Sequence, residues 1–173
     1  MRRDLVDKLL RELARLSGRA EVVIIGSQSL HAGAGKLPAE VLVSVEVDLL
    51  MEDGDPAETQ IEAELGRSSA FQAEHGVYID VVRSSFPYLP DGWEGRLRDM
   101  QVGELRARCL EVHDLAVSKL AAGRLKDNEL IAALIGHDLL DVDTLRARIG
   151  AIADLRLRAI LLARLQIVLE SVA

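Results

Sequence analysis

Cysteine and aromatic residues are scarce in this chain of 173 residues. Its one cysteine, Cys109, cannot form a disulfide within the chain, and apolar residues follow it closely. We therefore expect it to be a small core residue in a reducing compartment. Only 3% of the residues are aromatic while 49% are hydrophobic, so leucine, valine, isoleucine and alanine must supply most of the core.

The N-terminal segment lacks an uninterrupted hydrophobic run. The stretch MRRDLVDKLLRELARL carries charges throughout, which argues against a signal peptide and against a membrane span. Net positive charge is also lacking, since the chain has a formal net charge of -7. An acidic protein has no general avidity for nucleic acids or anionic membranes. We expect a cytoplasmic protein that does not act at a membrane.

Hydrophobic periodicity predicts alternating helices and strands up to about residue 112. A first helix ends at Ser17-Gly18, a short helix covers 27–32, and another begins at Asp55-Pro56. Runs of β-branched and other apolar residues predict four strands, over residues 21–25, 41–51, 77–82 and 106–112. This part of the chain predicts an α/β core with a mixed sheet flanked by helices.

From residue 113 onward the hydrophobic spacing is helical and no strand is indicated. The sequence thus predicts two regions, an α/β core over 1–112 and an all-helical region over 113–173 packed on it. Within the second region, the segment GHDLLDVD could suggest a metal hydrolase of the HD type. A simpler interpretation is that Gly136 ends one helix while Asp141 or Asp143 caps the next, and we favour it.

Three acidic residues interrupt strands that otherwise look buried. Glu46 and Asp48 alternate along one strand and therefore project from the same face, and Asp80 lies in the middle of another strand. Carboxylate oxygens are the ligands that hard divalent cations prefer, and a pair of such cations assists displacement at phosphorus. The alternative is an edge strand with one solvated face, which needs no metal.

A Gly-Ser pair follows the first predicted strand. Gly26 and Ser27 stand where that strand leads into a short helix. A missing side chain lets a phosphate approach backbone N–H groups there, and the serine hydroxyl can donate a further hydrogen bond. Alone, the Gly-Ser pair indicates only a strand-to-helix turn. It indicates a phosphate site only in combination with the acidic strands that follow.

Together these residues resemble the DNA polymerase β-like nucleotidyltransferase superfamily. Its pattern is a Gly-Ser or Gly-Gly turn, an acid-x-acid strand and a third acid on a later strand. The stretch SKLAAGRLKDNE resembles the Lys-Leu-x-Ala and Arg-x-Lys-Asp motifs of the AbiEii and MenT branch, the nucleotidyltransferase toxins of toxin–antitoxin and phage-exclusion loci. The segments GSQSL and SVEVDL look like an uncharacterised bacterial subgroup of this superfamily. The similarity covers roughly residues 20 to 135.

The resemblance implies a metal site and the residues that serve it. It makes Glu46, Asp48 and Asp80 the catalytic ligands of Mg²⁺ or Mn²⁺. It also implies a catalytic role for Lys119, at the triphosphate, and for Asp127, which would support the site or help to place the acceptor.

The resemblance further implies a nucleoside triphosphate as substrate. The residues expected to bind it are Gly26, Ser27, Lys119, Arg124 and Lys126. The implied reaction is transfer of a nucleotide to a hydroxyl group of an RNA, such as a tRNA 3′ end, or of a protein. An antitoxin would be the partner of a toxin-like member.

Two further readings stay open. The chain could be a catalytically degenerate module that keeps the fold and acts through a protein partner. In that case the apolar face of the last predicted helix could be a homodimer contact as readily as a core contact; its residues are Leu155, Ile160, Leu161, Leu165, Val168 and Leu169. Five arginines between residues 144 and 166 could hold RNA phosphates, but we favour a solvated helix face.

Overall fold

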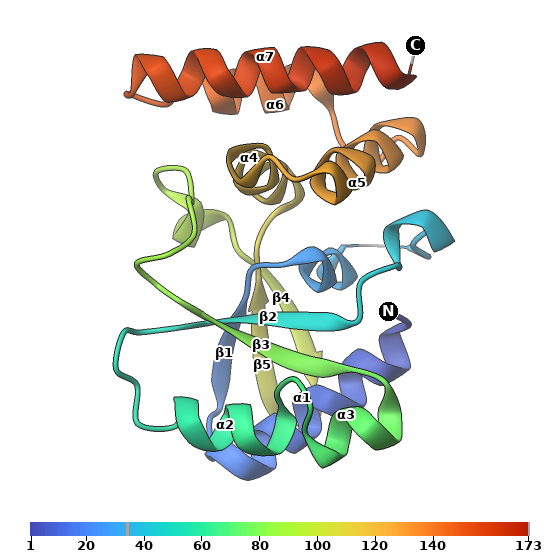
Figure 1. Ribbon diagram of the computed structural model, residues 1–173, viewed down its shortest axis with the longest axis vertical. Coiled ribbons are helices and arrows are strands. Elements are labelled where there is room, and N and C mark those ends of the chain that lie inside the picture. The colour runs from blue at the N-terminus through green and yellow to red at the C-terminus, as the bar shows by residue number, and fades with distance from the viewer. Residues whose placement is uncertain (34, 173) are drawn as a thin grey trace. The chain divides into compact units, whose positions relative to one another are not determined.

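The computed structural model describes residues 1–33 and 35–172. The chain forms two compact units, each held together by contacts among its own residues (Figure 1). The first consists of residues 1–87 and 97–110, and the second of residues 88–96 with the chain from Glu111 onward. The units are therefore not two consecutive stretches, because a segment between two strands belongs to the helical unit.

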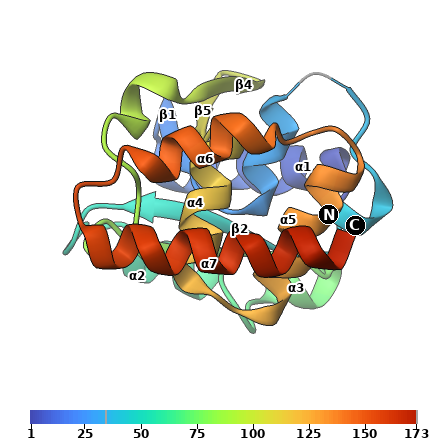
Figure 2. The same ribbon diagram turned by 90° about the horizontal axis from the view of Figure 1, so that it is seen from above.

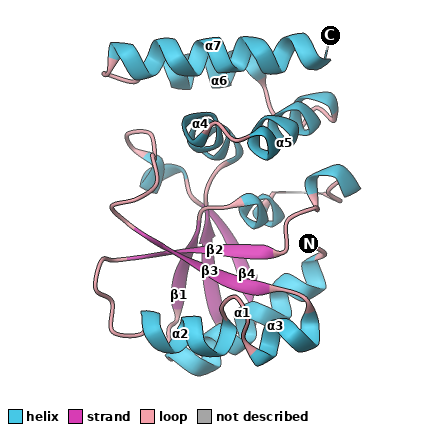
Figure 3. Ribbon diagram, viewed as in Figure 1, coloured by secondary structure: helices cyan, strands magenta, loops and turns pink. Residues whose placement is uncertain are grey.

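A five-stranded mixed sheet is the centre of the first unit (Figure 3). Its order is β3-β2-β1-β5-β4. The pairs β1–β2 and β4–β5 are antiparallel, whereas β1–β5 and β2–β3 are parallel. The strands are β1 (Glu21–Ile24), β2 (Glu46–Met51), β3 (Tyr78–Arg83), β4 (Arg98–Val102) and β5 (Leu105–Cys109).

Three helices pack on one face of this sheet, α1 (Arg3–Ser17), α2 (Glu58–Leu65) and α3 (Ala70–His75). The buried side chains of α1 recur at helical spacing and enter the core; they are Val6, Leu9, Leu10 and Leu13. The helix ends at Gly18, whose φ of 66° is a left-handed conformation that glycine adopts without strain. Two short 3-10 helices, η1 (Ser27–Ala32) and η2 (Ala39–Val41), lie between β1 and β2.

The two faces of the sheet differ in chemistry because strand side chains alternate. On β2, Val47, Leu49 and Met51 are buried in the core that the helices cover. The other face of β2 carries Glu46 and Asp48. We call this second side of the sheet the polar face.

The second unit is built from helices, α4 (Val112–Ala122), α5 (Leu125–Gly136), α6 (Val142–Gly150) and α7 (Leu155–Val172), with a 3-10 helix η3 (Trp93–Arg96). Within this unit α6 and α7 lie side by side (Figure 2). Asp114 of α4 is fully buried, and Arg96 binds it with both Nε and Nη2, at 2.8 and 3.1 Å. Arg148 of α6 also donates to this carboxylate. The ion triad thus ties η3 and α6 to α4.

The mixed sheet and the helical C-terminal half confirm the predicted fold class, but several boundaries were wrong. The strand predicted over 41–51 begins only at Glu46, and the one predicted over 106–112 ends at Cys109. The helix predicted from Asp55 begins at Glu58, although Asp55 still accepts a hydrogen bond from the Ala57 N–H. β4 and α3 were not predicted.

Cys109 and Asp141 follow the expectations from sequence. Cys109 is buried, and burial raises the pKa of its thiol to about 12. Asp141 caps α6 by accepting a hydrogen bond from the Thr144 N–H, as the cap interpretation of this segment requires. Across the described part of the chain, no helix is both long and apolar enough to cross a membrane.

Replacing Asp114 should destabilise the second unit strongly. Asp114→Ala removes the anion that Arg96 and Arg148 share and leaves both cations largely enclosed, which costs about 3–5 kcal/mol. Urea unfolding followed by circular dichroism measures this loss. The matched control is Asp143→Ala, because Asp143 is 91% exposed and pairs with Arg146 at 3.5 Å, so its removal should change stability by less than about 0.5 kcal/mol. Equal losses for the two variants would contradict a structural role of the triad.

Candidate active site on the polar face of the sheet

Asp48 and Asp80 are direct neighbours across the parallel pair β2–β3. Their Cα atoms are register partners, as are those of Glu46 and Tyr78. Side chains at paired positions of neighbouring strands project from the same face. The structure therefore brings Glu46, Asp48 and Asp80 onto one patch of the polar face, with Asp80 exposed and the other two half-buried.

The turn after β1 closes against the carboxylate of Asp48. The N–H of Ile25 donates to the carbonyl oxygen of Asp48 at 3.1 Å, which extends the β1–β2 pairing to the turn. A Cβ atom added to Gly26 would lie 1.5 Å from Asp48 Oδ2 and 2.8 Å from Asp48 Cβ. The backbone of Gly26 is extended, with φ −90° and ψ −168°, so any residue could adopt it. Glycine is required here for space.

Tyr78, which the sequence did not indicate, lies among the same acids. Its side chain is 2% exposed, and Arg67 donates to its hydroxyl while stacking on its ring, 4.7 Å from the centroid. Burial raises the pKa of the Tyr78 hydroxyl, and the charge of Glu46 raises it further. Arg67 lowers it, and Asp80 and Asp48 raise it again. All three carboxylates thus act on one phenol, as expected of a compact acidic patch.

The rest of the polar face balances its charges within the sheet. Arg106 of β5 binds Asp99 of β4 at 2.7 Å and Glu21 of β1 at 3.3 Å. β2 and β3 contribute three acids and no basic residue of their own to this face. The one basic residue in these two strands, Arg83, binds Glu58 of α2. Negative charge is therefore concentrated on the β2–β3 half of the face.

Gln28 is a second residue that sequence reasoning missed. It is 1% exposed, and its Nε2 donates to the Ser44 carbonyl oxygen at 3.2 Å, so it ties η1 to the segment that enters β2. Within the described residues its Oε1 has no hydrogen-bond partner, and neither has the Oγ of the neighbouring Ser29. Ser27 is buried beside them, at 8% exposure. Only the run of polar residues after Gly26 could have indicated this group, and it does not reveal burial.

The acidic patch fits a divalent cation only in part. Among the described residues, no group of three or more His, Cys, Asp or Glu side chains is arranged to hold a metal ion. A Mg²⁺ ion is commonly held by one or two carboxylates, with water and substrate phosphates as the other ligands. Asp48 and Asp80 can supply such a pair. The predicted third ligand, Glu46, lies on the same face two residues from Asp48 and stays a prediction.

The predicted residues of the helical unit form a separate group around Asp127. This carboxylate is 2% exposed, binds Arg124 at 2.7 Å and lies 3.8 Å from Lys119 Nζ. It also accepts the backbone N–H of Arg124 and so caps α5. Lys119 is largely enclosed, whereas Lys126 is exposed in the first turn of α5. The structure thus unites Lys119, Arg124 and Asp127.

Most arginine side chains of the C-terminal segment are bound within the unit, which the sequence alone does not indicate. Arg148 binds Asp114, Arg158 donates to the Ile152 carbonyl, and Arg164 donates to the carbonyls of Leu120 and Ala121. Arg146 pairs with Asp143, so four of the five arginines are engaged within the unit itself. This differs from the solvated helix face that we favoured.

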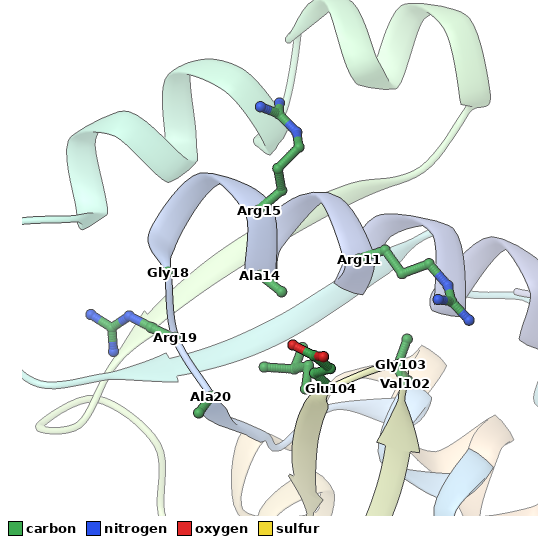
Figure 4. A pocket seen from close by; sticks show the side chains of 10 residues that line it. Arg11, Ala14, Arg15, Gly18, Arg19, Ala20, Val102, Gly103 and Glu104 are labelled. Atoms are coloured by element: carbon green, nitrogen blue, oxygen red, sulfur yellow. The ribbon is translucent and has the colours of Figure 1, made fainter.

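A depression of about 460 Å³ lies elsewhere in the first unit, between the C-terminal half of α1 and the β4–β5 turn. It is lined by arginines, but Figure 4 shows the side chains of Arg11, Arg15 and Arg19 pointing in different directions. Arg15 is paired with Glu12 and Arg19 with Asp55. None of the predicted site residues lines this depression, and its arginines do not converge on a ligand.

Comparison with known families assigns the chain. The model of the family described as nucleotidyltransferase of unknown function (DUF6036) matches residues 4–161, which include the acidic patch and the Asp127 group. The chain belongs to this family. Comparisons with the curated proteins and with the solved structures gave no match. Membership supports nucleotidyl transfer as the general activity and agrees with the resemblance to the wider superfamily.

Gly26→Ala should disturb the site and the fold together. The added methyl group overlaps the Asp48 carboxylate, so either the turn or Asp48 must move, at a cost of about 1–3 kcal/mol. Urea unfolding measures the loss. Gly150→Ala is the matched control, because an added Cβ there meets nothing within 4 Å and the residue lies in α6. The control should be unchanged or up to about 1 kcal/mol more stable. A Gly26→Ala variant as stable as the wild type would show that the close approach is not required.

Proposed function

We propose that this chain is a nucleotidyltransferase that uses a divalent cation, Mg²⁺ or Mn²⁺, and a nucleoside triphosphate. The observation that carries the proposal is the pairing of Asp48 with Asp80, with the Gly26 backbone packed directly against Asp48. Two adjacent carboxylates repel each other, and a bound cation removes that cost. The family of the chain points to the same reaction.

In this proposal Asp48 and Asp80, with Glu46, hold the cation. Gly26 and Ser27 bind the phosphates of the nucleotide. The Gly26 backbone lies directly against the Asp48 carboxylate, so phosphates bound at Gly26 and Ser27 would lie beside a cation held by Asp48. When bound, the cation would neutralise charge on the phosphate oxygens.

Cationic side chains of the helical unit are the second group of residues proposed to bind phosphate. Lys119, Arg124 and Lys126 bind the triphosphate, and Asp127 orients two of them, Lys119 and Arg124, through its ion pairs. In the transfer, an acceptor hydroxyl oxygen bonds to the α-phosphorus, and the bond to pyrophosphate breaks in line with it. The side chains need only position the reactants and balance charge, which is the larger part of catalysis in such reactions.

We further propose an RNA, such as the 3′ end of a tRNA, or a protein hydroxyl as acceptor, and a toxin-like role with an antitoxin partner. The support is the resemblance of the Lys119–Asp127 segment to the AbiEii and MenT branch. The acceptor is testable with an α-³²P-labelled triphosphate, total tRNA and purified protein: label on RNA, or on protein, identifies its class. Slower growth on expression of the wild type but not of Asp48→Asn would support the toxin role.

A second candidate function is a degenerate nucleotidyltransferase fold that acts as a binding module. It is favoured by the fact that the described residues include no ready three-ligand group for a metal. Such a module would bind a nucleotide or a protein partner without transfer. Metal dependence of nucleotide binding separates the two candidates.

Asp48→Asn and Asp80→Asn should each weaken Mg²⁺-dependent triphosphate binding by at least about tenfold, since each removes one charged ligand of a hard cation. Calorimetric titration of ATP, GTP, CTP and UTP, with and without Mg²⁺, measures the effect. Asp99→Asn is the matched control, because Asp99 lies on the same face of the sheet but is paired with Arg106. Absence of Mg²⁺-dependent binding by the wild type at millimolar triphosphate would refute the transferase proposal. Metal-independent binding that survives both substitutions would favour the binding module.

Lys119→Met should weaken triphosphate binding about tenfold while leaving the fold intact. Methionine keeps most of the length of the enclosed side chain and removes only the ammonium group, a point charge suited to phosphate. The same titration, together with thermal unfolding, reports both effects. Lys8→Met is a control for loss of one positive charge, because Lys8 is exposed on α1. Equal affinities of the Lys119 variant and the wild type would remove Lys119 from the proposed site.

A further inference from the structure

The last helix, α7, has two apolar faces. Leu161, Leu165 and Val168 are buried, and α7 contacts α4, α5 and α6 of its own unit. On another side of the helix, Ile160 and Ile167 are 47% and 59% exposed. Figure 2 shows α7 as a long straight helix beside α6. The core of the unit therefore accounts for only one of the two faces.

The exposed face follows a regular spacing. Arg156, Ile160, Ala163, Ile167 and Glu170 are separated alternately by four and three residues, which is the spacing of a helix–helix seam. We call these five residues the outer stripe of α7. All five are exposed or partly exposed in the structure. Two isoleucines flank a small alanine, and one charge lies at each end.

The other two arginines of α7 do not belong to this stripe. Arg158 donates to the Ile152 carbonyl oxygen at 2.9 Å, and Arg164 donates to the Leu120 carbonyl oxygen at 2.6 Å. The outer stripe therefore carries one cation and one anion, about 21 Å apart along the helix. Arg156 and Glu170 are each seven residues from Ala163. The stripe is thus complementary to itself when one helix is reversed.

We propose that the outer stripe of α7 pairs with the same stripe of a second copy of this chain, antiparallel and centred on Ala163. A two-fold axis there brings Arg156 of each copy to Glu170 of the partner subunit. Alanine at the crossing point allows the two helices to approach closely, and each Ile167 packs near the small Ala159 of the partner subunit. A parallel pairing would instead place like charges together. The proposal does not depend on the proposed function.

The expected dimer is weak. One helix pair buries less surface than the roughly 1,600 Å² of a stable interface, so association should depend on concentration in the micromolar range. Sedimentation velocity from about 1 µM to 1 mM covers this range. A wild type that stays monomeric up to 1 mM would overturn the proposal.

Charge reversal tests the orientation. Arg156→Glu and Glu170→Arg should each weaken the dimer about tenfold, because each creates two like-charge contacts per dimer. The double variant should return to within about threefold of the wild type. Neither single change should unwind α7, because Glu in the first turn and Arg in the last turn both suit the helix dipole. Lys36→Glu, at an exposed position between η1 and η2, controls for the change in net charge. A double variant as weak as the singles would overturn the antiparallel pairing.

Cysteine cross-linking tests the centre. Ala163→Cys should form a disulfide-linked dimer on mild oxidation, because the two copies of residue 163 meet at the axis. Ala159→Cys should not, because in the antiparallel pair its two copies are about 12 Å apart along the helices, beyond disulfide reach. The buried Cys109 gives no background. Equal cross-linking of both variants would indicate a parallel pair. If Ala163→Cys does not cross-link in a solution that contains dimers, the interface lies elsewhere. Either result would overturn the proposal.

Discussion

The contact between the Gly26 backbone and the Asp48 carboxylate is the constraint on which the candidate site depends. It exists because β1 and β2 are antiparallel, so that the end of β1 meets the middle of β2. The parallel pairing of β2 with β3 then places Asp80 beside the same carboxylate. One glycine, two strand pairings and two acids are therefore interdependent. Since interiors are close-packed, even a single methyl group at Gly26 cannot be absorbed without a shift.

The distribution of charge on the polar face is a second indication of function. Like charges at directly opposite positions of neighbouring strands are destabilising, and Asp48 and Asp80 occupy such positions. On the same face, Asp99 and Glu21 both bind Arg106. The concentration of acidic residues on β2 and β3 agrees with membership of a nucleotidyltransferase family.

Features that depend on the spacing of nearby residues could be predicted from the sequence. The alternation of Glu46 and Asp48, the helix that ends at Gly18 and the cap at Asp141 are all confirmed as structural features. Long-range contacts could not be predicted in this way. β4 has only Met100 and Val102 buried, α3 is six residues long, and the buried Gln28 donates to the carbonyl oxygen of Ser44, which lies 16 residues away in the sequence. The metal and nucleotide roles of the site residues remain predictions.

The helical unit shows why some of these roles are harder to probe than others. Asp127 accepts the Arg124 backbone N–H at the start of α5, so its removal would open the helix as well as release Arg124 and Lys119. Loss of activity in an Asp127 variant would therefore have two causes that activity alone cannot separate. The Lys119 ammonium caps no helix and lies at the end of a flexible side chain. Its replacement by an apolar chain of similar length removes the ammonium and its contact with Asp127 but no helix cap, so Lys119 reports more directly on phosphate binding than Asp127 does.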